Sequence, residues 1–428
     1  MTKLSLETIK SNIDRSSFVN IENFDQLMGI KQSQLFVNYP SSKKEQFDNF
    51  DLMSKPNTLY VHIPFCTGIC TYCAYVTSRA TLGDAKIDNY LDLLEKEFIL
   101  YYNKLGRIKI ATAYIGGGTP TIMDLPQLDR LYKLIHKHFD ISDIEEYTLE
   151  GCPETMVTDK VKQGMDNGIN RISMGVESFN DNILTRMNRR HSNKQSIKAI
   201  EQAKKLGISV DIDIIRCYPG YNEQMVLDDV NTINNVRPDS ITTYKYNLKP
   251  SSIDNKKIIP FLTNNETIEH TLLYYEGLKL GGYSQHNIDW FVADKKDTFK
   301  HQVYKWEYDA NQIALGVGVY GYIGNTQYFN HKSAVEYKNK INSNMLPISH
   351  GQTLDERELE DKNIMFALRD RVILNNFPKH KQKLDELVSN GLAHINNGYL
   401  ELNQIGKLYI DQIQSYFATN KQLCTLAN

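Results

Sequence analysis

The sequence predicts an α/β fold, a partial (β/α)6 barrel of the TIM type. Short β-rich runs alternate with stretches long enough for helices, and parallel strands are joined by such helical crossovers. The predicted strands are 57–63, 109–115, 146–150, 171–176, 209–215 and 240–244. The predicted helices between them include 85–105, 125–139, 192–206 and 222–236. Functional residues of such folds lie at the carboxyl ends of the strands.

The regions outside the barrel have other patterns. Residues 1–55 are mixed and polar, and are expected to form an N-terminal extension on a barrel core of residues 56–250. The alternation decays after residue 250, so 251–350 are assigned to a connecting region at the barrel mouth. Residues 351–428 are expected to form a small α+β domain resembling a winged helix, because 384–400 contain a helix, a Gly break and a short hairpin.

Composition excludes several classes of protein. The 428 residues include 49 Lys plus Arg and 51 Asp plus Glu, so no basic excess indicates a nucleic-acid partner. No apolar window of about 18 residues predicts a membrane span. The start of the chain lacks the apolar core of a signal peptide, and the six cysteines are not spread like a secreted disulfide framework. The protein is therefore expected in the cytoplasm.

Three cysteines lie close together directly after the first predicted strand. Cys66, Cys70 and Cys73 form a C-x3-C-x2-C pattern, and thiolates suit zinc or an iron–sulfur cluster. Structural zinc sites use four protein ligands, and no second cysteine pair is present. On a four-iron cluster, three thiolates leave one iron open, as a catalytic site requires. A coincidental grouping, or a zinc site completed by His62 or a distant residue, stays as an alternative.

The run from Tyr60 to Cys73, Tyr-Val-His-Ile-Pro-Phe-Cys and its two following cysteines, resembles the radical S-adenosylmethionine superfamily. More narrowly, it resembles the oxygen-independent coproporphyrinogen III oxidase family, which includes haem chaperones, anaerobic haem-degrading methyltransferases and class C methyltransferases. The resemblance covers nearly the whole chain from about Tyr39. It implies a [4Fe–4S] cluster on the three cysteines, with S-adenosylmethionine chelating the open iron. An electron, supplied by a flavodoxin- or ferredoxin-type donor, then cleaves S-adenosylmethionine to a 5′-deoxyadenosyl radical.

The resemblance also assigns residues to S-adenosylmethionine binding. The glycines of 116–118 close the second predicted strand, and such a run lets the backbone approach a ligand closely. Glu150 ends the third strand and matches a glutamate that contacts the ribose or amino group of the cofactor. A flexible turn, a solvated glutamate at the rim and ordinary core tyrosines are the alternatives. The residues assigned to cofactor binding are Tyr60, Tyr72, Gly117, Gly118, Thr119, Glu150, Glu177, Arg189 and Asp213.

Two positions depart from the family pattern. Arg189 and Asp213 match residues near a second S-adenosylmethionine, but Glu177 stands where glutamine is usual, and a carboxylate cannot donate a hydrogen bond as an amide does. One or two S-adenosylmethionine molecules are therefore expected. Cys217 replaces a usual glycine and is interpreted as a small buried residue. Further along the chain, residues that could face a substrate are His286, His301 and Tyr320.

Within the family, Tyr75 stands where oxidases proper usually carry a fourth cysteine, and the N-terminal extension argues against a chaperone. The leading hypothesis is a radical S-adenosylmethionine enzyme acting on a flat conjugated ring, either a tetrapyrrole or a heteroaromatic, with methyl transfer from a second S-adenosylmethionine. The alternatives are a haem-binding chaperone, an anaerobic coproporphyrinogen III oxidase and a non-catalytic zinc scaffold.

Overall fold

A parallel sheet forms the centre of the protein. The computed structural model describes residues 3–13, 52, 55–257 and 260–418, and the predicted α/β fold class is confirmed within them. Six neighbouring strands of the main sheet run parallel. In sheet order they are β1 (Asn57–Ile63), β4 (Thr112–Gly117), β5 (Glu146–Gly151), β6 (Arg171–Glu177), β7 (Ser209–Arg216) and β8 (Ser240–Lys245).

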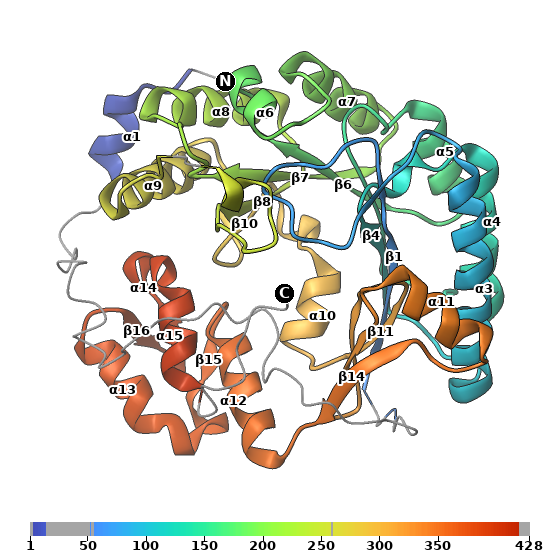
Figure 1. Cartoon of the computed structure of the whole chain (residues 1–428). Helices are drawn as coiled ribbons and strands as arrows, with labels where there is room; N and C mark the ends of the chain where they lie inside the picture. Colours follow the sequence, from blue (N-terminus) through green and yellow to red (C-terminus); the bar gives the residue numbers. More distant parts are fainter. Residues whose placement is uncertain (1–2, 14–51, 53–54, 258–259, 419–428) are drawn as a thin grey trace.

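Helices surround the outer face of this curved sheet (Figure 1). Their amphipathic faces bury aliphatic and aromatic side chains against the strands. Asp124 and Ser192 each form a capping box, which fixes where two of these helices begin. The helices that follow the strands are α3 (Ala85–Leu105), α4 (Leu125–His138), α5 (Thr158–Asp166), α6 (Asp181–Arg186), α7 (Asn193–Lys205) and α8 (Glu223–Val236).

Residues beyond 250 extend the sheet at both edges. At one edge, β11 (Asn311–Leu315) pairs in parallel with β1 and is followed by the antiparallel strands β12 (Tyr320–Ile323), β13 (Thr326–Asn330) and β14 (Ile348–Thr353). At the other edge, β10 (Trp290–Val292) and β9 (Ser284–Gln285) follow β8. The helices of this region are α9 (Asn264–Leu280), α10 (Lys300–Trp306) and α11 (Ala334–Asn342).

The C-terminal residues build a second core. Helix α13 (Lys381–Ser389) is followed by the hairpin of β16 (Ala393–Asn396) and β17 (Tyr399–Leu402), which is the predicted order of helix and hairpin. Their apolar side chains cluster separately from the barrel core. The remaining elements are α12 (Glu356–Ala367), β15 (Val372–Ile373), α14 (Gln404–Leu408) and α15 (Ile410–Phe417).

Of the predicted N-terminal extension, the structure describes mainly helix α1 (Leu6–Asn12). It packs on α8 and α9, where Lys10 pairs with Glu223 at 2.7 Å. The rest of the predicted extension, residues 14–51 and 53–54, lies outside the described residues. Among the helices that are described, none combines the length and apolar character needed to cross a membrane.

Candidate functional site

The cysteine loop leaves the carboxyl end of β1 and is closed at its base by two short strands. β2 (Phe65–Cys66) pairs in parallel with β3 (Ser78–Arg79). Cys66 is the last residue of β2, and the backbone N–H of Cys73 donates to the carbonyl of Cys70 at 3.2 Å. The three cysteines are unpaired and partly buried. The loop therefore presents three thiols at the end of the barrel where functional residues are expected.

Segments far away in the sequence hold this loop in place. The N–H of Thr71 donates to the carbonyl of Met187 at 3.0 Å, and the side-chain amide of Asn188 donates to the carbonyl of Ile69 at 2.7 Å. From a third segment, the N–H of Asp254 donates to the carbonyl of Thr71 at 2.9 Å. The cysteine loop is thus fixed by backbone hydrogen bonds on both sides.

The thiols are not arranged around a single metal ion together with other protein ligands in the described part of the chain. Burial raises the pKa of Cys66 to about 12 and that of Cys73 to about 11, and a bound metal would displace these thiol protons. His62 is engaged elsewhere, because its ring nitrogens contact the Tyr60 hydroxyl at 3.3 Å and the Val76 carbonyl at 3.2 Å.

The glycine turn after β4 packs directly against the cysteine loop. Gly117 has a φ of +115°, and a Cβ there would lie 2.5 Å from Nδ1 of His62. A Cβ on Gly118 would lie 2.9 Å from the Cys66 sulfur. The N–H of Thr119 donates to the Phe65 carbonyl at 2.8 Å, and its side chain hydrogen-bonds the Cys66 thiol. Only glycine leaves room for this contact.

Buried and half-buried carboxylates gather towards the carboxyl ends of β5, β6 and β7. The Oε2 of Glu150 accepts a hydrogen bond from the Gly117 N–H at 3.0 Å, and burial raises the pKa of Glu150 to about 7. The Oδ2 of Asp213 accepts from the Ser173 hydroxyl at 3.2 Å. Burial and the neighbouring carboxylates, including Glu177, raise the pKa of Asp213. A cationic ligand would offset the cost of burying these charges.

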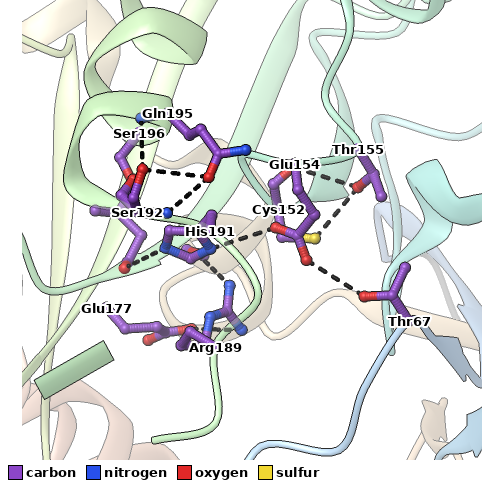
Figure 2. A network of polar contacts seen from close by, with 12 residues as sticks. Thr67, Cys152, Glu154, Thr155, Glu177, Arg189, His191, Ser192, Gln195 and Ser196 are labelled. Atoms are coloured by element: carbon purple, nitrogen blue, oxygen red, sulfur yellow. Dashed lines mark hydrogen bonds and ion pairs between the residues drawn. The ribbon is translucent and has the colours of Figure 1, made fainter. Parts of the chain in front are cut away.

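Arg189 connects this acidic region to the cysteine loop. Its Nη1 donates to the Cys70 sulfur at 3.3 Å and to the Tyr72 hydroxyl at 3.5 Å, and lies 3.5 Å from Oε1 of Glu177. Its Nη2 donates to the Gly175 carbonyl, whereas its Nε, although buried, has no partner among the described residues. Figure 2 shows Arg189 beside Glu177 in this network.

Most of the residues assigned from the sequence converge on this region. Tyr60 lies beside His62 and stacks on Tyr114 with 6.0 Å between ring centroids, and Tyr72 contacts Arg189. Glu177 and Cys217 have φ values of +66° and +64°, a conformation that favours glycine. This conformation explains why glycine would suit position 217, where the buried Cys217 thiol donates to the Thr267 carbonyl at 3.5 Å.

Two further histidines lie away from the cysteine loop. His301 is buried at the opposite end of β4, where its Nδ1 contacts the Thr112 hydroxyl at 2.9 Å. His286 lies beside the β9–β10 turn, its N–H donating to the Trp290 carbonyl at 2.9 Å. Tyr320, the third residue expected to face a substrate, lies beside Lys305. The Nζ of Lys305 is 5.4 Å from the centroid of the Tyr320 ring.

Two residues that were not singled out from the sequence belong to the same network. Glu154 and His191 form a buried pair next to Arg189 and the cysteine loop (Figure 2). Glu154 lies four residues after Glu150 and His191 lies two residues after Arg189, but nothing in the sequence indicates that the two residues meet.

Comparison with known proteins agrees with this arrangement. Residues 60–233 match the model of the radical SAM superfamily. The haem chaperone HemW of Lactococcus lactis is 26% identical over 84% of this chain and 94% of its own length. The oxygen-independent coproporphyrinogen III oxidase of Escherichia coli is 23% identical over 85% of this chain and 86% of its own. The solved structure of E. coli coproporphyrinogen III oxidase (HemN) superimposes with a TM-score of 0.79, at 22% identity, over 92% of this chain and 98% of that one.

The fold and the sequence match both point to a radical SAM domain. Residues 60–233 are similar to the radical SAM superfamily, and the chain has relatives among HemW haem chaperones and oxygen-independent coproporphyrinogen III oxidases. Similarity to this superfamily implies a [4Fe–4S] cluster and S-adenosylmethionine.

Proposed function

We propose that the protein is a radical SAM enzyme that acts on a tetrapyrrole or another conjugated ring. One observation carries this proposal: Arg189 lies within 3.5 Å of both the Cys70 sulfur and the Glu177 carboxylate, so the cysteine loop and the acidic strand ends form a single site. In that site the cluster and S-adenosylmethionine, when bound, would supply reductive cleavage to a 5′-deoxyadenosyl radical. The protein supplies position and excludes water.

Each part of the site has a role in this proposal. Cys66, Cys70 and Cys73 hold the cluster, and the turn at Gly117 and Gly118 lets the backbone pass close to the Cys66 sulfur. The sulfonium and ammonium groups of S-adenosylmethionine are positively charged. The carboxylates of Glu150, Glu177 and Asp213 would offset this charge. Thr119, Tyr60 and Tyr72 complete the walls of the site.

The choice of substrate rests on the homologues. HemW is named as a haem chaperone and HemN as a coproporphyrinogen oxidase, so both names involve tetrapyrroles. The match of Arg189 and Asp213 to residues near a second S-adenosylmethionine supports a second bound molecule and methyl transfer as the finer part of the proposal. A flavodoxin- or ferredoxin-type protein is the proposed electron donor.

Product analysis tests the proposal. Anaerobically purified, reconstituted protein is incubated with dithionite, S-adenosylmethionine and a porphyrin, and the products are separated by chromatography. We expect 5′-deoxyadenosine, and S-adenosylhomocysteine if a methyl group is transferred. A fully loaded cluster that forms no 5′-deoxyadenosine would overturn the radical proposal, whereas the nucleoside without S-adenosylhomocysteine would exclude only methyl transfer.

The second candidate function is a haem chaperone. The relationship to HemW over 84% of this chain favours it. So does Tyr75, a largely exposed residue at the position of the fourth cysteine of the oxidases. A haem titration followed by absorbance distinguishes the two functions. Tight stoichiometric haem binding without cleavage of S-adenosylmethionine would select the chaperone.

A further inference from the structure

A buried pair of side chains lies behind the proposed site. Glu154 belongs to the turn after β5, and His191 directly precedes the N-cap of α7. The Nδ1 of His191 is 3.3 Å from Oε2 of Glu154, and its Nε2 is 3.1 Å from the Val176 carbonyl (Figure 2). The His191 side chain is fully buried, and that of Glu154 is 17% exposed.

Both polar partners of the His191 ring, the carboxylate of Glu154 and the carbonyl oxygen of Val176, are hydrogen-bond acceptors. Burial alone would raise the pKa of Glu154, but the hydrogen bond from His191 and the charge of Arg189 lower it to about 2. The negative carboxylate of Glu154 therefore lies against the buried ring of His191.

The same carboxylate reaches the cysteine loop. The other oxygen of Glu154, Oε1, accepts a hydrogen bond from the hydroxyl of Thr67 at 3.3 Å, and Thr67 directly follows Cys66. On the opposite side, His191 holds the carbonyl of Val176, which precedes Glu177. His191 is also two residues beyond Arg189. One buried pair thus connects the loop that carries the thiols with the two segments that carry Glu177 and Arg189.

We propose that Glu154 and His191 are positioning residues, which set the cysteine loop relative to Arg189 and Glu177 and thereby tune the cluster and the binding of S-adenosylmethionine. This inference rests on the proposed function. Among the described residues, the hydrogen bonds of Glu154 and His191 reach Thr67 and Val176 and not the thiols of Cys66, Cys70 or Cys73. Partners of this kind, one step removed from a ligand, typically change affinity or activity by about 10- to 100-fold when they are replaced.

The test compares two carboxylate-to-amide variants in the full-length, anaerobically reconstituted protein. Glu154→Gln removes the charge of the positioning pair. Asp361→Asn is the matched control, because Asp361 forms a second buried pair with His380 in the C-terminal core, at 3.5 Å, remote from the cysteine loop. The measurements are the thermal midpoint, the EPR spectrum of the reduced cluster with and without S-adenosylmethionine, and the dissociation constant of S-adenosylmethionine.

We expect both variants to lose thermal stability, but only Glu154→Gln to change the EPR spectrum and to weaken S-adenosylmethionine binding by about tenfold or more. If Glu154→Gln keeps the wild-type spectrum and affinity, the pair is merely structural and the inference is wrong. Wild-type protein that binds neither cluster nor S-adenosylmethionine would instead contradict the proposed function.

Thr67→Val gives an independent test if Glu154→Gln does not fold. It removes only the hydrogen bond between the cysteine loop and Glu154 and leaves the contact with His191 intact. We expect a folded protein with a changed EPR spectrum. A spectrum and an affinity identical to wild type would overturn the inference.

Discussion

The Nη1 of Arg189 lies 3.3 Å from the sulfur of Cys70, although the two residues are separated by more than a hundred positions. This contact joins the segment between α6 and α7 to the cysteine loop. Because Nη1 is also 3.5 Å from Glu177, the guanidinium sets the distance between a proposed cluster ligand and the carboxylates at the strand ends.

Replacement of Arg189 by lysine should therefore weaken S-adenosylmethionine binding by about 10- to 100-fold. A single ammonium cannot reproduce the planar set of donors that contacts Cys70, Tyr72 and Gly175. Isothermal titration under anaerobic conditions measures the change. Arg107→Lys is the control, because Arg107 is exposed and donates to the His136 carbonyl, away from the cysteine loop. Equal affinities in the two variants would contradict the role proposed for Arg189.

Alanine at Cys66, Cys70 or Cys73 should abolish the iron–sulfur absorbance while the barrel remains folded. The loop is held by a hydrogen bond to the Met187 carbonyl and by hydrogen bonds from Asn188 and Asp254, rather than by the thiols themselves. Iron content and circular dichroism test both parts of the prediction. Cys217→Ala, at a buried cysteine outside the loop, should keep its iron. If the loop variants unfold instead, the metal is structural.

Gly117→Ala should prevent cluster assembly. Its Cβ would lie 2.5 Å from His62 Nδ1, in addition to the strain of a φ of +115°. Gly207→Ala separates the two effects, because Gly207 has a φ of +79° with no atom near the new Cβ. We expect Gly207→Ala to lose only about 1–2 kcal/mol of unfolding free energy and to assemble a normal cluster. The iron content per chain and the unfolding free energy from chemical denaturation are measured for both variants.

His301 should make the protein less stable in acid. Burial lowers the pKa of His301 to about 3, so the folded state keeps it neutral while the unfolded chain takes up a proton near its ordinary pKa of about 6.5. The unfolded state then binds more protons between these values, and stability falls as the pH drops from about 6.5 towards 3.

The size of this effect is at most about 1.4 kcal/mol per pH unit. His301→Asn should flatten the dependence of the unfolding free energy on pH over this range, relative to wild type. Urea denaturation at several pH values between about 4 and 7 measures the slope. A variant whose slope equals that of wild type would show that His301 does not cause the acid lability.

The parallel barrel was predictable because each of its strands has a local signal. The predicted strand 57–63 and helix 85–105 agree with β1 and α3 at both ends. The predicted strand 109–115 begins too early, since Lys109 forms only an isolated bridge with Asp140 and β4 starts at Thr112. The connecting region 251–350 gave no strand prediction, because its strands are short and pair mainly as antiparallel neighbours.

The proposed site also has one part that the sequence predicts and another part that it does not predict. The cysteine loop and the glycine turn are contiguous motifs, and the sequence alone points to them. The pair of Glu154 and His191 is different, because its members are 37 positions apart and each is unremarkable by itself. Only the fold brings them to the same place as Thr67. The positive φ of Glu177 is also invisible in the sequence, since no glycine marks it.

The pairing of β1 with β11 has a consequence for synthesis on the ribosome. β1 emerges early, but one of its neighbours, β11, starts only at Asn311. At a translation rate of about 5–20 residues per second, that partner follows roughly 10–50 seconds later. The nascent chain therefore carries its thiol-bearing loop on a strand with one open edge during this interval.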